Sequence, residues 1–152
     1  LTRVRMKLHC TLFKNPKMKY VVYENNVEVN ELPGRSLRWM ITPEMKLTKN
    51  FSMNIVSIKP GDTVKPAHSH PKVEEVIYVS RGHGKAYIDG LVHEICEGTV
   101  VLFKPGMIHM LRNDGLDEMK VVCIFIPSAT LNDDYTFYED INFPITENSK
   151  AE

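Results

Sequence analysis

The sequence predicts an all-β protein, built as an antiparallel sandwich or barrel. Short apolar runs recur at close, regular spacing, turn residues separate them, and almost no stretch has helical periodicity. Size and composition agree with this fold class. A chain of 152 residues with 43% hydrophobic and 25% charged residues can bury the core of one ordinary domain.

The expected strands are apolar runs bounded by glycine, proline and aspartate. They span residues 19–23, 36–41, 51–58, 75–80, 84–88, 91–95, 100–103, 109–113 and 119–126. The run 51–58 alternates in part, as a half-buried strand does, whereas 121–126 is continuously apolar and predicts a strand covered on both faces. Asp89-Gly90 predicts a tight hairpin. The one place where we expect room for a short helix is 133–140.

No repeat, low-complexity tract or linker divides the chain, so we expect a single domain over residues 1–152. Its core barrel is expected at about 50–127. The N-terminal strands within 19–41 and the C-terminal segment 128–152 are expected to pack on that barrel.

Charge and cysteine content restrict the class of partner and compartment. The formal net charge is zero, so nothing predicts a nucleic-acid or membrane partner. The first twenty residues are basic and the last twenty acidic; we interpret them as solvated termini, or as segments that pair within a chain or across a dimer. Cys10, Cys96 and Cys123 form no CxxC pair, no apolar run is long enough to span a bilayer, and no signal peptide is visible. We therefore expect a cytoplasmic protein.

Two histidines stand in a pattern that favours metal binding. His68 and His70 are two residues apart, so on a strand both imidazoles project from one face. His109 opens a later expected strand, directly after a Pro-Gly turn, and would arrive from a neighbouring strand. Three imidazoles at one point are typical ligands of a divalent metal ion.

A carboxylate completes this set. If Glu75 faces inward, Ile77 and Val79 face inward with it, which leaves an acid among apolar neighbours. Such an acid is costly without a partner, and a cation removes the difficulty. Glu74 is the competing carboxylate, but the phase of the strand favours Glu75, with Glu74 pointing out. The sequence thus predicts one divalent metal ion held by residues His68, His70, Glu75 and His109.

These residues fall in two motifs in which the chain resembles the cupin superfamily. The first family motif, G-x5-HxH-x3,4-E-x6-G, matches residues 61–82, with one extra residue between Gly61 and His68. The second, G-x5-PxG-x2-H-x3-N, matches residues 98–113, except that Lys104 replaces the proline. Fifteen residues, 83–97, separate the motifs, which is the short spacing of the family. The resemblance implies a cupin double-stranded β-helix, that is, a jelly-roll barrel.

The resemblance also implies what the site does. An octahedral ion on these four ligands keeps two open positions for water, dioxygen or a bidentate oxygen ligand. Mn, Fe or Ni is favoured, and Zn, Co or Cu is possible. We expect a metalloenzyme of the dioxygenase, decarboxylase or isomerase type that acts on a small oxygenated substrate, because all four ligands are present whereas cupins that only bind often lack some. The alternative is a non-catalytic module that binds or senses a small molecule or sugar anchored by the metal. The family further implies a homodimer in which the N-terminal segment pairs across subunits.

Several further residues are candidates for the surroundings of the site. His9, His83 and His93 lack the motif context, and we expect His83 to be exposed. The family pattern gives Asn113 a supporting hydrogen-bonding role. Candidates for an apolar wall are Met53, Phe103, Met107, Met110 and Phe125, and candidates for polar substrate contacts are Arg38, Asn54, Tyr87 and Lys104.

Overall fold

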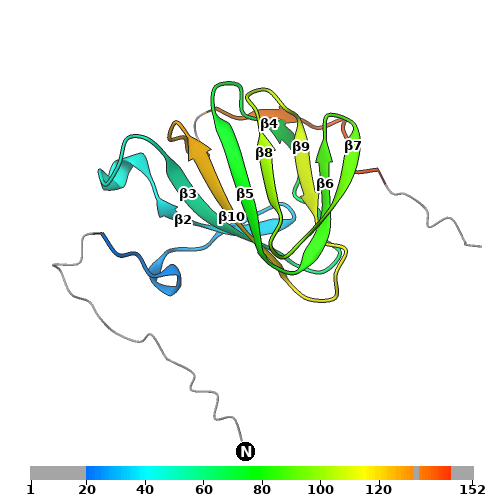
Figure 1. Cartoon of the computed structure of the whole chain (residues 1–152), viewed down its shortest axis with the longest axis horizontal. Coiled ribbons are helices and arrows are strands. Elements are labelled where there is room, and N and C mark those ends of the chain that lie inside the picture. Colours follow the sequence, from blue (N-terminus) through cyan, green and yellow to red (C-terminus); the bar gives the residue numbers. More distant parts are fainter. Residues whose placement is uncertain (1–19, 132–133, 145–152) are drawn as a thin grey trace, which may run out of the picture.

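The computed structural model of the chain describes residues 20–131 and 134–144. These residues form two antiparallel sheets that face each other and enclose the core (Figure 1). The expected all-β jelly-roll barrel is confirmed. Within the described ranges, none of the helices has the length and hydropathy that crossing a membrane requires.

The larger sheet has the strand order β1-β2-β3-β10-β5-β8. Its strands are β1 (Asn30–Leu32), β2 (Arg35–Ile41), β3 (Ser52–Ile58), β10 (Met119–Ile126), β5 (Glu74–Arg81) and β8 (Val100–Phe103). The smaller sheet has the order β11-β4-β9-β6-β7. Its strands are β11 (Thr136–Tyr138), β4 (Ala67–Ser69), β9 (His109–Arg112), β6 (His83–Ile88) and β7 (Leu91–Cys96). Two short 3-10 helices, η1 (Glu24–Asn26) and η2 (Pro43–Met45), flank β1 and β2.

The alternation of side chains along the strands decides what faces the core. On β10 the inward residues are almost fully buried, and they include Val121, Cys123 and Phe125. The outward residues Val122 and Ile124 are only half-buried, and Ile126 is 44% exposed. The expectation that this apolar run is covered on both faces is therefore wrong for its outer face.

The core lies between the inner faces of the two sheets. Its largest fully buried apolar side chains include Phe103, Phe125, Ile58 and Ile77. Burying one such side chain contributes about 1.5–3 kcal/mol. A second, smaller cluster of Ala67, Met110 and Phe143 lies on the other side of β4 and β9. The space that remains between the sheets holds the polar residues described below.

The structure confirms most expected strands and corrects two expectations. The hairpin at Asp89-Gly90 has positive φ at both residues and joins Ile88 to Leu91, as a two-residue turn of this type requires. Residues 20–23 form no strand, and η1 follows them. The described part of 133–140 contains β11, not a helix, because it pairs with β4 as an edge strand. The strands β1, β4 and β11 are three residues long, too short to give a periodic signal.

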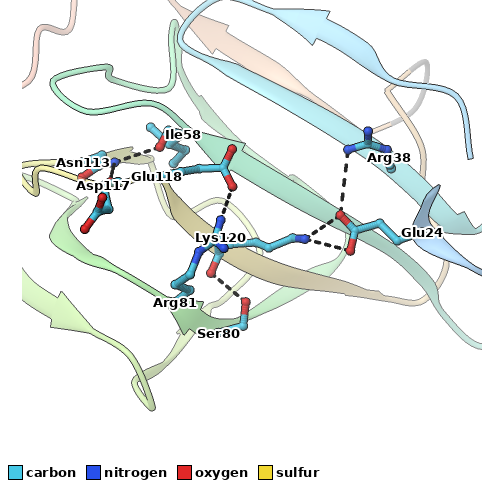
Figure 2. A network of polar contacts seen from close by, with 9 residues as sticks. All are labelled: Glu24, Arg38, Ile58, Ser80, Arg81, Asn113, Asp117, Glu118 and Lys120. Atoms are coloured by element: carbon cyan, nitrogen blue, oxygen red, sulfur yellow. Dashed lines mark hydrogen bonds and ion pairs between the residues drawn. The ribbon is translucent and has the colours of Figure 1, made fainter. Parts of the chain in front are cut away.

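Two polar networks hold the barrel together away from the cavity (Figure 2). On the outer face of the larger sheet, the carboxylate of Glu24 accepts from Lys120 Nζ at 2.6 and 2.8 Å and lies 3.9 Å from Arg38. Inside, the side chain of Asn113 donates from Nδ2 to the carbonyl oxygens of Ile58 and Asp117, both at 2.8 Å. The first network ties the segment before β1 to the sheet, and the second closes one end of the barrel.

Candidate metal centre

The four side chains that the sequence singles out lie together in the barrel. His68 is on β4, His70 directly follows it, Glu75 is on β5 and His109 opens β9. One ligand atom from each lies within 4.8 Å of the others. All four are buried, with exposed fractions between 2% and 6%. A group of this composition can bind a metal ion.

Backbone carbonyls orient each of the three imidazoles. The Nδ1 atom of His68 lies 3.1 Å from the carbonyl oxygen of Pro66, and that of His109 lies 2.9 Å from the carbonyl of Met107. The Nδ1 atom of His70 lies 3.0 Å from the carbonyl of Asp134. A carbonyl oxygen only accepts, so each Nδ1 carries the proton and donates it. In the neutral rings, Nε2 is then a lone pair that points away from the backbone.

These lone pairs meet a carboxylate oxygen. The Nε2 atoms of His70 and His109 lie 3.1 and 3.0 Å from Glu75 Oε2. None of these three buried atoms has a hydrogen-bond partner among the described residues. Buried acceptors facing one another are unfavourable, and a shared cation relieves this. The residues present therefore fit a divalent metal ion.

The protonation states agree with this donor set. Burial lowers the pKa of His68 well below its usual value, and the neighbouring His109 adds to this effect, so His68 is neutral at pH 7. Burial by itself raises the pKa of Glu75. In protein without metal, hydrogen bonds and charge interactions from His109 and His70 outweigh burial and hold that pKa well below its usual range, which requires N–H groups of these rings to face the carboxylate until a cation takes their place. His68 is thus neutral and Glu75 ionised, the forms in which these two side chains bind metals.

A narrow cavity with a free volume of about 30 Å³ leads to the centre. Two of the expected apolar wall residues line it, Phe103 and Phe125, and one of the expected polar residues, Asn54. The ring of Phe103 stacks on His109 at a centroid distance of 3.9 Å. The remaining lining residues are Arg35, Leu37, Val56, Val64, His68, Glu75, His109, Leu111, Cys123 and Tyr135.

The other expected wall residues do not line the cavity. On β3, Met53 is next to the inward-facing Asn54 and therefore points to the outer face of the larger sheet. On β2, Arg38 is next to the inward-facing Leu37 and points to the same outer face. Met110 packs in the small cluster with Ala67, and Tyr87 packs against that cluster. The turn that holds Met107 and Lys104 is outside the cavity wall, with Lys104 exposed.

Sequence reasoning missed three residues near the centre. Arg35 and Tyr135 line the cavity, and the Tyr135 ring stacks on His68 at 5.5 Å and meets the edge of His70 at 4.3 Å. The carboxylate of Asp134 accepts from the backbone N–H groups of residues 72 and 73 at 2.9–3.0 Å, while its carbonyl orients His70. Arg35 is two residues before the apolar Leu37, which is on an expected strand, and this spacing was a signal that both face inward. No local signal marks 134 and 135.

The residues set aside in the sequence are indeed outside the centre. His83, His93 and Glu74 are exposed, and His9 lies outside the described residues. Asn113 is fully buried and hydrogen-bonded to backbone groups, and it is not part of the metal-binding group.

A jelly-roll barrel with three histidines and one glutamate buried together is the arrangement that the resemblance to the cupin superfamily implies. Comparison agrees, because residues 54–125 match the family model described as Cupin domain, and the chain contains such a domain. The chain is similar to polyketide synthase CurC of Streptomyces cyaneus, with 28% identity over 72% of this chain and 70% of that protein.

Two solved structures have the same fold. One is a predicted oxalate decarboxylase from Thermotoga maritima, with a TM-score of 0.64, 19% identity, and coverage of 70% of this chain and 98% of that one. The other is the polyketide cyclase RemF from Streptomyces resistomycificus, with a TM-score of 0.60, 18% identity, and coverage of 70% and 78%. At these identities the likeness concerns the fold alone.

Proposed function

We propose that the chain is a metal-dependent cupin enzyme that acts on a small oxygenated substrate. The observation that carries this proposal is the convergence of buried lone pairs from His70 and His109 on Glu75 Oε2 without hydrogen-bond partners. The ligands are His68, His70, Glu75 and His109. Mixed nitrogen and oxygen donors suit Mn, Fe or Ni, and they also accept Zn, Co or Cu.

When bound, such an ion supplies Lewis-acid or dioxygen-activating chemistry to an oxygen ligand, which covers dioxygenase, decarboxylase and isomerase reactions. The chain itself supplies the setting. Backbone carbonyls hold the imidazole rings in the ligating tautomer. Phe103 and Tyr135 stack on His109 and His68 and exclude water from one side of each ring.

The comparisons support an oxygenated substrate. Polyketides carry many carbonyl groups, and the names of CurC and RemF refer to polyketide synthesis and cyclisation, while that of the Thermotoga protein refers to oxalate. Polyketides and oxalate both present oxygen atoms that can bind a metal ion. We therefore place carbonyl and carboxylate compounds first among substrates to be tried.

The test measures metal content by mass spectrometry in the wild type and in the variants His68→Ala and His109→Ala. The matched control is His93→Ala, which removes an exposed histidine of β7. We expect stoichiometric metal in the wild type and the control, and little in the two cavity variants. Stoichiometric metal in both cavity variants contradicts the site. Identical behaviour of metal-free and metal-loaded protein across a panel of carbonyl and phenolic compounds contradicts the enzymatic proposal.

One observation favours the alternative, a non-catalytic module that binds or senses a small molecule or sugar. Beyond the metal-binding group, the cavity lining offers few acid–base groups. Burial raises the pKa of Cys123 well above its usual value and also raises the pKa of Tyr135. Neither group is then a ready proton acceptor at pH 7. Tight binding of a panel compound without turnover in metal-loaded protein would favour this alternative.

We also propose that two copies associate through the outer face of the larger sheet. That face carries exposed Tyr78, Val100, Leu102 and Ile126, in strands whose inner residues face the core. Apolar side chains clustered on one face are typical of association surfaces. We expected the N-terminal segment to pair across subunits, and its first 19 residues lie outside the described part of the chain. Further along, β2 pairs with β3 of its own chain.

Light scattering tests the dimer. We expect the wild type to be a dimer at micromolar concentration and Leu102→Glu to be a monomer. Leu116→Glu is the control, because Leu116 is 93% exposed in the loop before β10 and lies outside this face. A monomeric wild type contradicts the proposal.

The cytoplasmic location and the single-domain division stay predictions. In the described residues, Cys96 and Cys123 are free thiols.

A further inference from the structure

Arg35 brings a positive charge into the cavity without an acidic partner among the described residues. It begins β2 in phase with Leu37, and both line the cavity. Its one hydrogen bond within the described chain is long, 3.4 Å from Nη1 to the carbonyl oxygen of Lys65, and no carboxylate there lies within ion-pair distance. Arg38, three residues later on the outer face, instead lies 3.9 Å from Glu24. A guanidinium held inside a cavity without an anion is available to bind one.

Asn54 adds an unpaired polar atom to the same cavity. Its side chain is 2% exposed, and Oδ1 has no hydrogen-bond partner among the described residues. It lies on β3 opposite Cys123 of β10, with both residues facing inward. A buried amide oxygen without a partner is unfavourable. A hydroxyl group of a bound molecule would satisfy it.

The charges of the lining do not balance once a divalent ion is bound. The ion contributes two positive charges and Arg35 contributes one, whereas Glu75 alone contributes a negative charge. The imidazoles are neutral in their ligating form, and the ordinary pKa values of a thiol and a phenol leave both neutral at pH 7. Two positive charges in a buried cavity favour a ligand that brings negative charge with it.

We propose that this cavity is selective for small oxygen chelators that carry a separate anionic group, a carboxylate or an enolate. Arg35 binds the anionic group, and Asn54 accepts a hydrogen bond from a hydroxyl group of the same molecule. This inference rests on the proposed metal centre and names the class of ligand that it takes. It makes Arg35 a specificity-determining residue.

The test compares two probes of nearly equal shape. Butyrohydroxamate and succinate monohydroxamate share a metal-chelating head, and they differ in whether the flexible arm ends in a methyl group or a carboxylate. Calorimetry measures the affinity of each for the full-length, metal-loaded protein. We expect the carboxylate probe to bind about tenfold more tightly, which is the effect of one charge-assisted hydrogen bond.

Variants assign this preference to its residue. We expect Arg35→Gln to reduce the preference to about twofold or less and Arg35→Lys to keep part of it, because the charge is retained. Arg38→Gln, which removes an arginine from the outer face of the same strand, keeps the full preference. Metal content, measured in every sample, is expected to be unchanged.

Two results overturn the inference: equal affinity of the wild type for the two probes, or an undiminished preference in Arg35→Gln. Failure of the metal centre gives a different result, namely metal content near zero in the wild type. In that case the affinities of the two probes for the wild type and for Arg35→Gln are compared on protein without metal. Metal content thus reports on the metal centre, and the ratio of the two affinities reports on Arg35.

Discussion

Two buried polar clusters of the barrel contrast in how well they are satisfied. At one end, Asn113 donates from Nδ2 to Ile58 and Asp117, and its Oδ1 accepts from the N–H of Gly115 at 2.8 Å. At the other end, the Nε2 atoms of His70 and His109 face Glu75 without partners. The first cluster needs nothing further from outside the chain. The second is complete only with a cation.

A single strand connects the two clusters. β9 begins at His109, and Asn113 follows its last residue. Both residues belong to the second motif, in which the family resemblance makes His109 a metal ligand and gives Asn113 a supporting role. The hydrogen-bond inventory makes this distinction, because satisfied buried groups stabilise structure and unsatisfied ones indicate a missing partner. The predictions below test this distinction.

The largest expected effect is on stability at Asn113. Asn113→Ala removes two buried hydrogen bonds and one that is partly buried, and we expect a loss of free energy of unfolding of about 3 kcal/mol, at roughly 1 kcal/mol for each bond. Urea unfolding of the full chain measures it, with Asn30→Ala, at an exposed position of β1, as the control. The loss is expected to be the same with metal and with chelator. A loss seen with metal alone contradicts the contrast between the clusters.

Metal binding is expected to stabilise the wild type by nearly as much. With free metal at 100 times its dissociation constant, linkage gives about 2.7 kcal/mol. Unfolding in urea with and without chelator measures this difference. His109→Ala is expected to abolish it and to leave the stability with chelator close to that of the wild type, since the substitution removes one of the opposed acceptors. An equal metal effect in the wild type and His109→Ala would sink this prediction.

A smaller effect is expected at Asp134, which orients His70 from outside the metal-binding group. Asp134→Ala frees the N–H groups of residues 72 and 73 and loosens the segment whose carbonyl holds the His70 ring. We expect metal affinity to fall about tenfold, as is common for residues that orient a ligand. Competition with a chelator of known affinity measures it. Asp140→Ala, at an exposed turn after β11, is the control.

The smallest expected effect is on the pH dependence of stability without metal. The pKa of His68 is lowered in the folded protein, so between that value and about 6.5 the unfolded chain binds more protons. Stability is therefore lost as the pH falls below about 6.5. The pKa of Glu75 is also lowered, so its contribution is present above its unfolded value and is lost at still lower pH. Urea unfolding across this range measures the slope.

The titration also separates the two clusters. Asn113 does not titrate, so Asn113→Ala is expected to shift the whole stability profile down without changing its shape. His68→Ala is expected to flatten the part of the profile just below pH 6.5. An unchanged slope in His68→Ala contradicts the assignment.

The four residues of the centre were readable from the sequence because their spacing carries the geometry. Two histidines separated by one residue share a strand face, and the phase of Ile77 and Val79 placed Glu75 inward. Burial confirms that phase, with Glu75 at 5% and both apolar neighbours fully buried. The sequence thus predicts those features of the centre that follow from the alternation of side chains along a strand.

The rest of the cavity depends on contacts distant in the sequence. Arg38 was expected to reach the ligand, but Arg35 lines the cavity instead, because Arg35 and not Arg38 is in phase with the buried Leu37. Asp134 and Tyr135 reach the centre through the pairing of a three-residue strand with β4. No local pattern predicts such a pairing, since it arises only when the barrel closes.

The hydrogen bond between His70 and Asp134 joins residues 64 positions apart. During synthesis the ribosome therefore releases all four side chains of the candidate centre before the residue that orients one of them. A nascent chain that stops short of β11 can form most of both sheets, yet its His70 ring lacks the carbonyl that holds it. If the group binds a metal ion, we therefore expect binding to follow the docking of the C-terminal strand.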